Sequence, residues 1–300
     1  MLQWIPAPVK GALNALFLAI HTLFWCIPLY FFFFLRLLAK SSSFRLFVNR
    51  CIIKVCSGWV RSNTLMMKQT MSIDLDAPDF SHLSKDQWYF VICNHQSWTD
   101  ILILQRIFLN NIPFLRFFIK KQLLWLPAIN LAWLALDFPI MHRHSKEQLE
   151  KNPELRNKDR IATKTACEKY QHIPVTILNF LEGTRFTVAK QHKQQSIYQN
   201  LLMPKAGGFS LAISAMDKKI THVLDITIVY PEDKTTFWEF LCGRVHKIVV
   251  KLTEREIPPA LLQGNYTEDE QYRNQFKQWI NQLWHEKDAL INTLLKSPPP

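Results

Sequence analysis

Glycine is scarce in this chain, and neither a low-complexity tract nor an internal repeat interrupts it. Only seven of its 300 residues are glycine, and the one proline run is a tail at residues 298–300. These absences argue against a disordered chain. The length is enough for one large domain or two small ones.

Cysteine pairs with metal-ligand spacing are also lacking. The six cysteines include no C-x-x-C pair, and Cys26 lies within an apolar run. This pattern argues against a disulfide framework and against a zinc site built from cysteines. The sequence therefore predicts mostly buried thiols in a reducing compartment.

Charged side chains are absent from residues 11–35, which contain no Asp, Glu, Lys or Arg. About 20 apolar residues suffice for a helix to cross a bilayer. A secretory signal is one alternative, but the run is longer than an ordinary signal's apolar region and no small-x-small cleavage site follows it. A buried core helix is another. We predict membrane insertion, and Pro28 leaves open whether the run spans the bilayer or re-enters it as a hairpin.

Acidic residues are fewer than basic ones, 24 against 36, which gives a formal net charge of +12. This excess favours anionic partners, such as nucleic acid or the charged face of a bilayer. Lys10 precedes the apolar run, and a basic flank follows it: Arg36, Lys40, Arg45, Arg50 and Lys54. The positive-inside tendency then predicts that the rest of the chain lies on the cytoplasmic face of the membrane, the inner membrane in a bacterium.

Residues 44–60 mix apolar and basic side chains. This pattern suits a helix lying along the membrane interface, and equally an ordinary amphipathic helix packed on the domain. We predict three regions: a membrane-anchoring helical region at 1–65, a catalytic domain at 66–255, and an amphipathic helix with a tail at 256–300.

From about residue 72, short apolar strands alternate with helices. Strands are expected at residues 88–93, 138–141, 175–180, 223–230 and 245–252, and helices at 98–108, 159–171 and 209–216. This alternation indicates an α/β fold, a mixed sheet flanked by helices. Near the end, Thr267 and Glu270 have capping-box spacing before a helix whose apolar residues favour core packing over a membrane-facing stripe.

The strand at residues 88–93 runs directly into the polar sequence "NHQSWTD". His95 and Asp100 would lie about 140° apart on one regular helix. They can pair if His95 lies in the loop and Asp100 in the first turn of the next helix, for which Ser97 is a good N-cap. The paired imidazole would keep one nitrogen free as a base for a substrate hydroxyl. The alternative is a hydrogen-bonded turn.

A second apolar strand ends in the polar residues Glu182, Gly183, Thr184 and Arg185. Gly183 permits a tight turn and close backbone approach. The planar fork of Arg185 suits a phosphate. The alternative is a strand-end turn with a local Glu–Arg pair.

The two clusters together resemble the glycerolipid acyltransferase family, which includes the lysophosphatidic acid acyltransferases. That family carries an N-H-x-x-x-x-D motif and, later, an F-P-E-G-T-R motif, similar here to "NHQSWTD" and "FLEGTR". Residues 119–143 look like the family's K-x-x-L…P stretch followed by a strand ending in arginine. "LDFPIMHRHS", "EGTRFT" and "LLMPKAGG" look most like the branch with lysophospholipid and lysocardiolipin acyltransferases and their bacterial relatives. The resemblance spans residues 91–231.

The resemblance implies a role for each matching residue. His95 would be the general base that deprotonates the acceptor hydroxyl, and Asp100 would orient it. The acceptor site, with arginines near the phosphate, would contain Lys120, Arg143, Glu182, Gly183 and Arg185.

The implied reaction is membrane-bound transfer of a fatty acyl group from a thioester, on coenzyme A or acyl carrier protein, to a lysophospholipid hydroxyl. The expected acceptor is 1-acyl-sn-glycerol-3-phosphate, giving phosphatidic acid, or else another lysophospholipid such as a lysocardiolipin. The expected partners are membrane lipids, the acceptor and the acyl donor. No cofactor, metal or nucleic acid is expected.

Some positions depart from the family pattern. Leu181 replaces the usual proline, Asn130 and Asp137 stand where many members have glycine, and "DITIVYP" at residues 225–231 only approximates a fourth motif. These departures keep the His–Asp pair and leave the acceptor open.

Two further groups of residues suggest other functions. "HRH" at residues 142–144 suggests a metal site, but no third ligand is placed by spacing, and a solvated basic turn is simpler. The basic segment at 189–194 and residues 218–219 suggest a membrane-anchored RNA-binding or regulatory protein. No stacking aromatics are interleaved there, so a charged surface loop is simpler.

Overall fold

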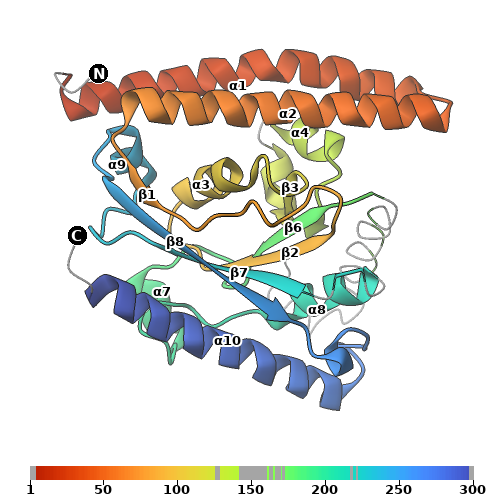
Figure 1. The fold of residues 1–300 in the computed structure, drawn as a ribbon, viewed down its shortest axis with the longest axis vertical. Helices are drawn as coiled ribbons and strands as arrows, with labels where there is room; N and C mark the ends of the chain where they lie inside the picture. Colours follow the sequence, from red (N-terminus) through yellow and green to blue (C-terminus); the bar gives the residue numbers. More distant parts are fainter. Residues whose placement is uncertain are drawn as a thin grey trace.

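The computed structural model describes residues 5–125, 129–141, 161, 165, 170, 173–216, 219–220 and 222–296. Its elements form layers (Figure 1): the long helices α1 (Ala7–Leu38) and α2 (Ser42–Thr70) lie over one face of a sheet. Between them and the sheet lie α3 (Thr99–Phe108), α4 (Asn130–Ala135) and α9 (Phe237–Leu241). The opposite face carries α8 (Ala206–Ala215) and α10 (Glu270–Lys296).

The six-stranded sheet has the order β1-β8-β7-β2-β6-β3. Only β7 and β8 are antiparallel, and the other neighbours are parallel. The strands are β1 Asp74–Asp76, β2 Tyr89–Cys93, β3 Leu115–Phe117, β6 Thr176–Phe180, β7 His222–Val229 and β8 Lys247–Glu256. A separate parallel pair joins β4 (Ile119–Lys120) and β5 (Ile140–Met141). This arrangement confirms the predicted mixed α/β fold.

All five expected strands are present, with ends displaced by up to four residues. The short strands β1, β3 and β4 were not expected, because two or three residues show no alternation. Among the expected helices, 98–108 and 209–216 correspond to α3 and α8, while 159–171 lies outside the described residues apart from three isolated positions.

Strand β2 is buried on both faces, which explains its continuous apolar run. Phe90 belongs to the hydrophobic core shared with Phe209 on α8 and Phe276 on α10. Val91 belongs to a second core, with Ile103 of α3. Two packed faces thus fix the strand that ends beside the polar loop.

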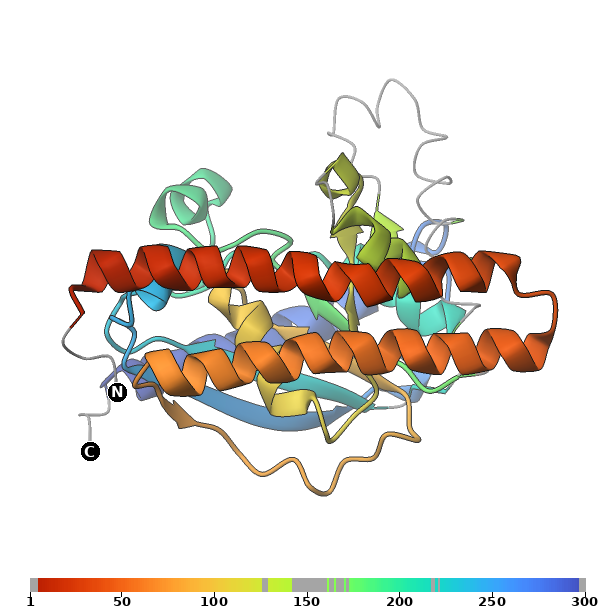
Figure 2. The same ribbon diagram turned by 90° about the horizontal axis from the view of Figure 1, so that it is seen from above.

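The two N-terminal helices run side by side across the whole molecule (Figure 2). Helix α1 is continuous over 32 residues with Pro28 inside it, so the apolar run is not divided into a hairpin. A Cβ at Gly58 would lie 2.3 Å from the Trp25 ring, which shows how closely the helices approach. Helix α1 is long and apolar enough to cross a membrane, and 11% of its most apolar 18-residue window is buried.

Residues 44–60 form part of α2, which buries Val48, Ile52, Cys56 and Val60 at helical spacing. Helix α10 begins two residues later than predicted. Asp269 Oδ1 accepts the N–H of Tyr272 at 2.9 Å, so Asp269 caps the helix. The expected capping box is therefore wrong. It would have made Glu270 the third residue of the helix, whereas Glu270 is the first.

Candidate active site

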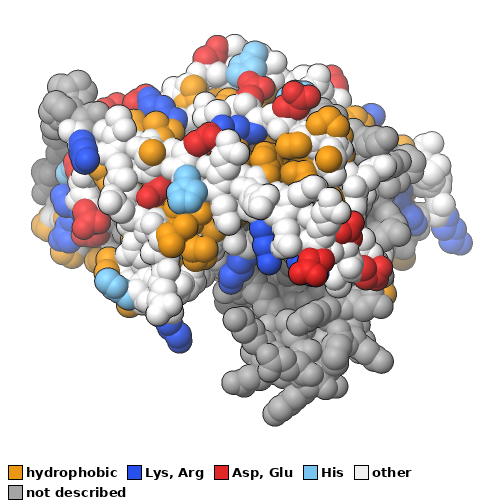
Figure 3. All heavy atoms as spheres, turned by 90° about the horizontal axis from the view of Figure 1, so that it is seen from below, with side chains coloured by type: hydrophobic (Ala, Val, Ile, Leu, Met, Phe, Trp, Pro, Cys, Tyr) orange, Lys and Arg blue, Asp and Glu red, His pale blue; other side chains and the backbone are white. Residues whose placement is uncertain are grey.

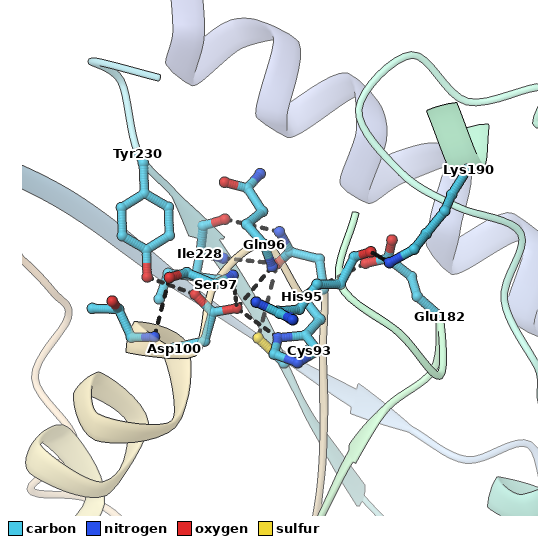
Figure 4. A network of polar contacts seen from close by, with 12 residues as sticks. Cys93, His95, Gln96, Ser97, Asp100, Glu182, Lys190, Ile228 and Tyr230 are labelled. Carbon is cyan, nitrogen blue, oxygen red and sulfur yellow. Dashed lines mark hydrogen bonds and ion pairs between the residues drawn. The ribbon is translucent and has the colours of Figure 1, made fainter. Parts of the chain in front are cut away.

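The loops after β2 and β6 meet because these parallel strands are neighbours, with Cys93 in register with Phe180. The N–H of His95 donates to Glu182 Oε1 at 2.8 Å. The N–H of Phe186 donates to the carbonyl of His95 at 2.7 Å. The two polar clusters, almost ninety residues apart in sequence, thus form one site (Figure 4).

Asp100 is the buried centre of this site. Its side chain is fully buried, and its Oδ2 lies 2.8 Å from His95 Nδ1. The same oxygen accepts the backbone N–H groups of Gln96 and Ser97, at 2.7 and 2.9 Å. The other oxygen accepts the Tyr230 hydroxyl at 2.5 Å. Together these contacts fix the plane of the carboxylate against the imidazole.

The pairing follows the predicted geometry, with His95 in the loop and Asp100 in the first turn of α3. Helix α3 is assigned from Thr99, but Trp98 before it already has helical backbone angles and makes no capping bond, whereas the Ser97 hydroxyl accepts the N–H of Thr99 at 3.1 Å, as expected of a cap. The N–H of Ser97 in turn donates to the Asp100 carboxylate three residues later, the reciprocal bond of a capping box.

The His95 ring is held from one side and open at one nitrogen. It stacks on Phe180, with centroids 3.9 Å apart and planes 17° apart. The side chain is 12% exposed. With Asp100 accepting from Nδ1, Nε2 carries the lone pair and has no hydrogen-bond partner among the described residues. This geometry suits a base.

Tyr230 and Asn94 are site residues that the sequence did not identify. Asn94 bridges β2 to β7, donating to the carbonyl of Ile228 at 2.8 Å and accepting its N–H at 2.9 Å. Tyr230 follows β7 and is fully buried against Asp100; burial and the nearby Asp100 charge raise its pKa well above the ordinary value. The phenol therefore stays protonated and donates. Residues 225–231 were the available signal, but sequence alone does not show that β7 lies next to β2.

Glu182 is fully buried, and backbone donors take both its oxygens. Oε1 accepts from His95 and Oε2 from the N–H of Leu202 at 2.9 Å. Burial raises the pKa of this carboxyl to about 8, although the two backbone hydrogen bonds lower it. Glu182 thus links three chain segments beneath the site. Gly183 follows at φ 69°, a left-handed turn that favours glycine.

Arg185 is exposed, and its guanidinium carbon lies 5.0 Å from the centroid of the Trp98 ring. The nearby Lys190 donates to Thr184 Oγ1 at 3.0 Å and to the Arg185 carbonyl at 2.8 Å. Two cations and an exposed aromatic ring therefore lie beside the loop that carries His95. Trp98 was not singled out from the sequence, although it lies inside the first motif.

The side chains of two expected site residues lie beyond what the structure describes. Lys120 is in β4, where its backbone is in register with Met141, and its side chain is outside the described part. Arg143 and the sequence "HRH" lie outside the described residues altogether. Within the residues that the structure describes, no three His, Cys, Asp or Glu side chains gather as metal ligands would. Asp137, where many members have glycine, has φ 53°, a conformation that favours glycine.

The chain is similar to known proteins over most of its length. A family model described as Acyltransferase matches residues 79–231, just over half of the chain. A 2-acyl-1-lysophosphatidylinositol acyltransferase of Saccharomyces cerevisiae is 25% identical over 271 residues, covering 76% of this chain and 66% of its own. A human 1-acyl-sn-glycerol-3-phosphate acyltransferase gamma is 25% identical over 182 residues, covering 57% and 43%. The chain thus spans from under half to about two thirds of these relatives.

A solved structure shares the fold. The 1-acyl-sn-glycerophosphate acyltransferase PlsC from Thermotoga maritima superposes with a TM-score of 0.57 and 16% sequence identity, covering 97% of each chain. At that identity, the likeness shows the common architecture of sheet and flanking helices.

Proposed function

Because the chain belongs to the acyltransferase family, we propose that it transfers a fatty acyl group from a thioester to the free hydroxyl of 1-acyl-sn-glycerol-3-phosphate, giving phosphatidic acid. The observation that carries this proposal is the pair formed by His95 and the fully buried Asp100, 2.8 Å apart, with Nε2 open. The donor is coenzyme A or acyl carrier protein.

In the proposed step, His95 Nε2 takes the proton of the acceptor hydroxyl as its oxygen attacks the thioester carbonyl. The tetrahedral oxyanion collapses, the C–S bond breaks, and the leaving thiolate takes the proton from the imidazolium. Asp100 holds the tautomer and stabilises the imidazolium, as in other His–Asp pairs. The products are the diacyl lipid and a free thiol, and the enzyme returns to its starting state.

Arg185 and Lys190 supply the positive charge for the acceptor's phosphate in this proposal. Arg185 is exposed beside Trp98, and its planar fork can make two parallel bonds to a phosphate. Glu182 has a different role from the one the resemblance implies. Because both of its oxygens bind backbone N–H groups, we propose that it positions the His95 loop and does not contact the acceptor.

Membrane binding is proposed to occur through α1. Large hydrophobic side chains of this helix are about half or more exposed: Leu13, Leu16, Phe17, Ile20, Leu23, Phe24, Ile27, Phe31 and Phe34. On the face opposite α1, hydrophobic side chains form separate patches among charges of both signs (Figure 3). Helix α1 lies lengthwise on the domain, which favours embedding along one leaflet over a perpendicular crossing (Figures 1 and 2). The basic residues after α1 support placing the site on the cytoplasmic face.

A second acceptor has a specific observation in its favour. The yeast relative, which covers 76% of this chain, is named for an acceptor with an inositol headgroup. A lysophospholipid with a larger headgroup is therefore the alternative substrate, and lysocardiolipin belongs to the same class.

The test is lipid mass spectrometry of products formed by the purified chain. Lysophosphatidic acid, lysophosphatidylinositol and lysocardiolipin would each be offered with a defined acyl-CoA and with the matching acyl carrier protein. We expect phosphatidic acid as the main product. Preferred acylation of lysophosphatidylinositol would support the alternative, and thioester cleavage without any diacyl product would contradict acyl transfer.

A further inference from the structure

The cleft between α2 and the end of α3 collects positive charge, and none of its described lining residues is acidic. It has a volume of about 270 Å³ and is lined by Arg61, Thr64, Lys68, Arg106, Leu109 and Asn110. Three of these six residues are cations, and none is acidic. Within the described part of the chain, neither Lys68 nor Arg106 forms an ion pair, and Arg61 reaches only the side-chain oxygen of Asn110 at 3.3 Å.

Arg106 is the informative member of this group. It is half-buried, and burial lowers the pKa of its guanidinium, with no acidic side chain to counter that effect. Arginine nevertheless stays protonated in proteins. Removing such a charge from water without a partner is unfavourable, so an anion placed in the cleft would be stabilised.

The cleft lies apart from the site around His95. Asp100 is in the first turn of α3 and Arg106 is in the last, about 9 Å further along the helix axis. Arg185, by contrast, lies beside Trp98 at the start of α3, at the other end of this helix from Arg106. The cleft is therefore separate from the cations beside His95.

The surroundings of the cleft indicate a membrane lipid. Leu65 lies on α2 between Arg61 and Lys68, on the same side of the helix, and its side chain is 56% exposed. Helix α2 also lies beside α1 (Figure 2), many of whose large hydrophobic side chains are exposed. Basic residues bordering exposed apolar ones are typical of the headgroup layer of a bilayer.

We propose that this α2–α3 cleft binds the headgroup of an anionic phospholipid, with Arg61, Lys68 and Arg106 around its phosphate. Its small, concave shape suits a headgroup better than the surface of an acidic carrier protein. Lipid binding in the cleft does not depend on the chemistry proposed at His95. Either proposal can therefore fail while the other holds.

The test uses the full chain in neutral detergent micelles with dioctanoyl phosphatidylglycerol, and native mass spectrometry gives the apparent Kd of bound lipid. Arg61→Gln with Lys68→Gln should weaken binding about 25-fold, about fivefold for each cation. The control pair Lys277→Gln and Lys296→Gln removes the same charge from exposed positions of α10 and should change the Kd less than about twofold.

Three outcomes would overturn the proposal. Equal weakening in both pairs would mean that only net charge matters. Displacement of the lipid by millimolar inorganic phosphate would indicate a site for free phosphate. Equal binding of dioctanoyl phosphatidylcholine would mean that the headgroup charge is not recognised. The variants alter exposed side chains, and their melting temperatures would establish that they fold.

Discussion

The loop site around His95 and the α2–α3 cleft lie at opposite ends of α3, and they handle charge in opposite ways. Asp100 is fully buried and surrounded by donors from three backbone or side-chain groups besides His95. Arg106 is half-buried and has no acidic partner among the described residues. A fully partnered charge is held for chemistry within the protein, whereas an unpartnered one is available to a ligand.

Within the loop site, Arg185 combines a fixed backbone with a side-chain charge that is available to a ligand. Its turn is fixed by Gly183 and by Lys190, yet among the described side chains its guanidinium contacts only the Trp98 ring. The loop site therefore contains a fixed base next to a cation that can meet a phosphate. Substitutions that disturb either feature should have separable effects.

The largest effect is expected for His95→Ala, which removes the proposed base from the loop site. Turnover should fall by about 10²–10⁴-fold, the usual contribution of general base catalysis. Initial rates of thiol release in the presence of acceptor would measure it. His82→Ala is the matched control, because this half-exposed histidine also binds a carboxylate, that of Glu254. A folded His95→Ala protein within tenfold of wild-type turnover would contradict the assignment.

Arg185→Lys tests the ligand-facing cation of the loop site. Lysine keeps the charge but loses the planar fork, so the KM for lysophospholipid should rise more than the KM for the acyl donor. The loss in kcat/KM should be roughly 5- to 150-fold, the scale of a charge-assisted contact. Steady-state kinetics with each substrate varied in turn would separate the two KM values, with the exposed Arg244→Lys as control. Equal changes in both would leave Arg185 a structural role only.

Tyr230→Phe removes one donor from Asp100 without changing the shape of the core. We expect kcat to fall about tenfold, within the scale of a hydrogen bond to a charged group. The carboxylate, with one donor fewer, should stabilise the imidazolium more, so the acid limb of the pH profile of kcat/KM should move to higher pH. Tyr89→Phe removes another largely buried phenol, one that binds the N–H of Ser84. An unshifted profile in Tyr230→Phe would assign this residue to packing alone.

The last effect concerns stability and not activity. The carboxyl of Glu182 titrates near 4.5 in the unfolded chain and near 8 when buried. Between these values the folded state binds more protons, so raising the pH from about 5 to 8 lowers the free energy of unfolding. Glu182→Gln removes this titration, and its melting temperature should fall less over that range than that of wild type. Parallel curves in the same detergent would show that Glu182 does not titrate there.

Much of this fold was predictable, because its strands are apolar runs that end in polar loops. His95 and Asp100 were identifiable from local spacing, since they belong to one loop and one helix turn. Tyr230 and Asn94 were not, because their contacts depend on β7 lying beside β2, a long-range pairing that no local pattern encodes. The role of Glu182 was obscured for the same reason: its partner Leu202 lies in a distant segment.

The α2–α3 cleft also could not be predicted from the sequence. Arg61 and Lys68 read as ordinary basic residues of an amphipathic helix, and Arg106 as a charge in the last turn of α3. Only the packing of α2 over α3 brings the three together. By contrast, the α1 prediction needed no packing information, because the uncharged run is long enough by itself.

The most direct test of the central claim is the stoichiometry of the reaction. Purified wild-type protein would be mixed with a defined acyl-CoA with and without 1-acyl-sn-glycerol-3-phosphate, and free thiol and phosphatidic acid would be measured in the same samples. Activation of the acceptor hydroxyl by His95 predicts equal amounts of the two products, both dependent on acceptor and both lost in His95→Ala. Thiol release at the same rate without acceptor, or undiminished in His95→Ala, would contradict the account.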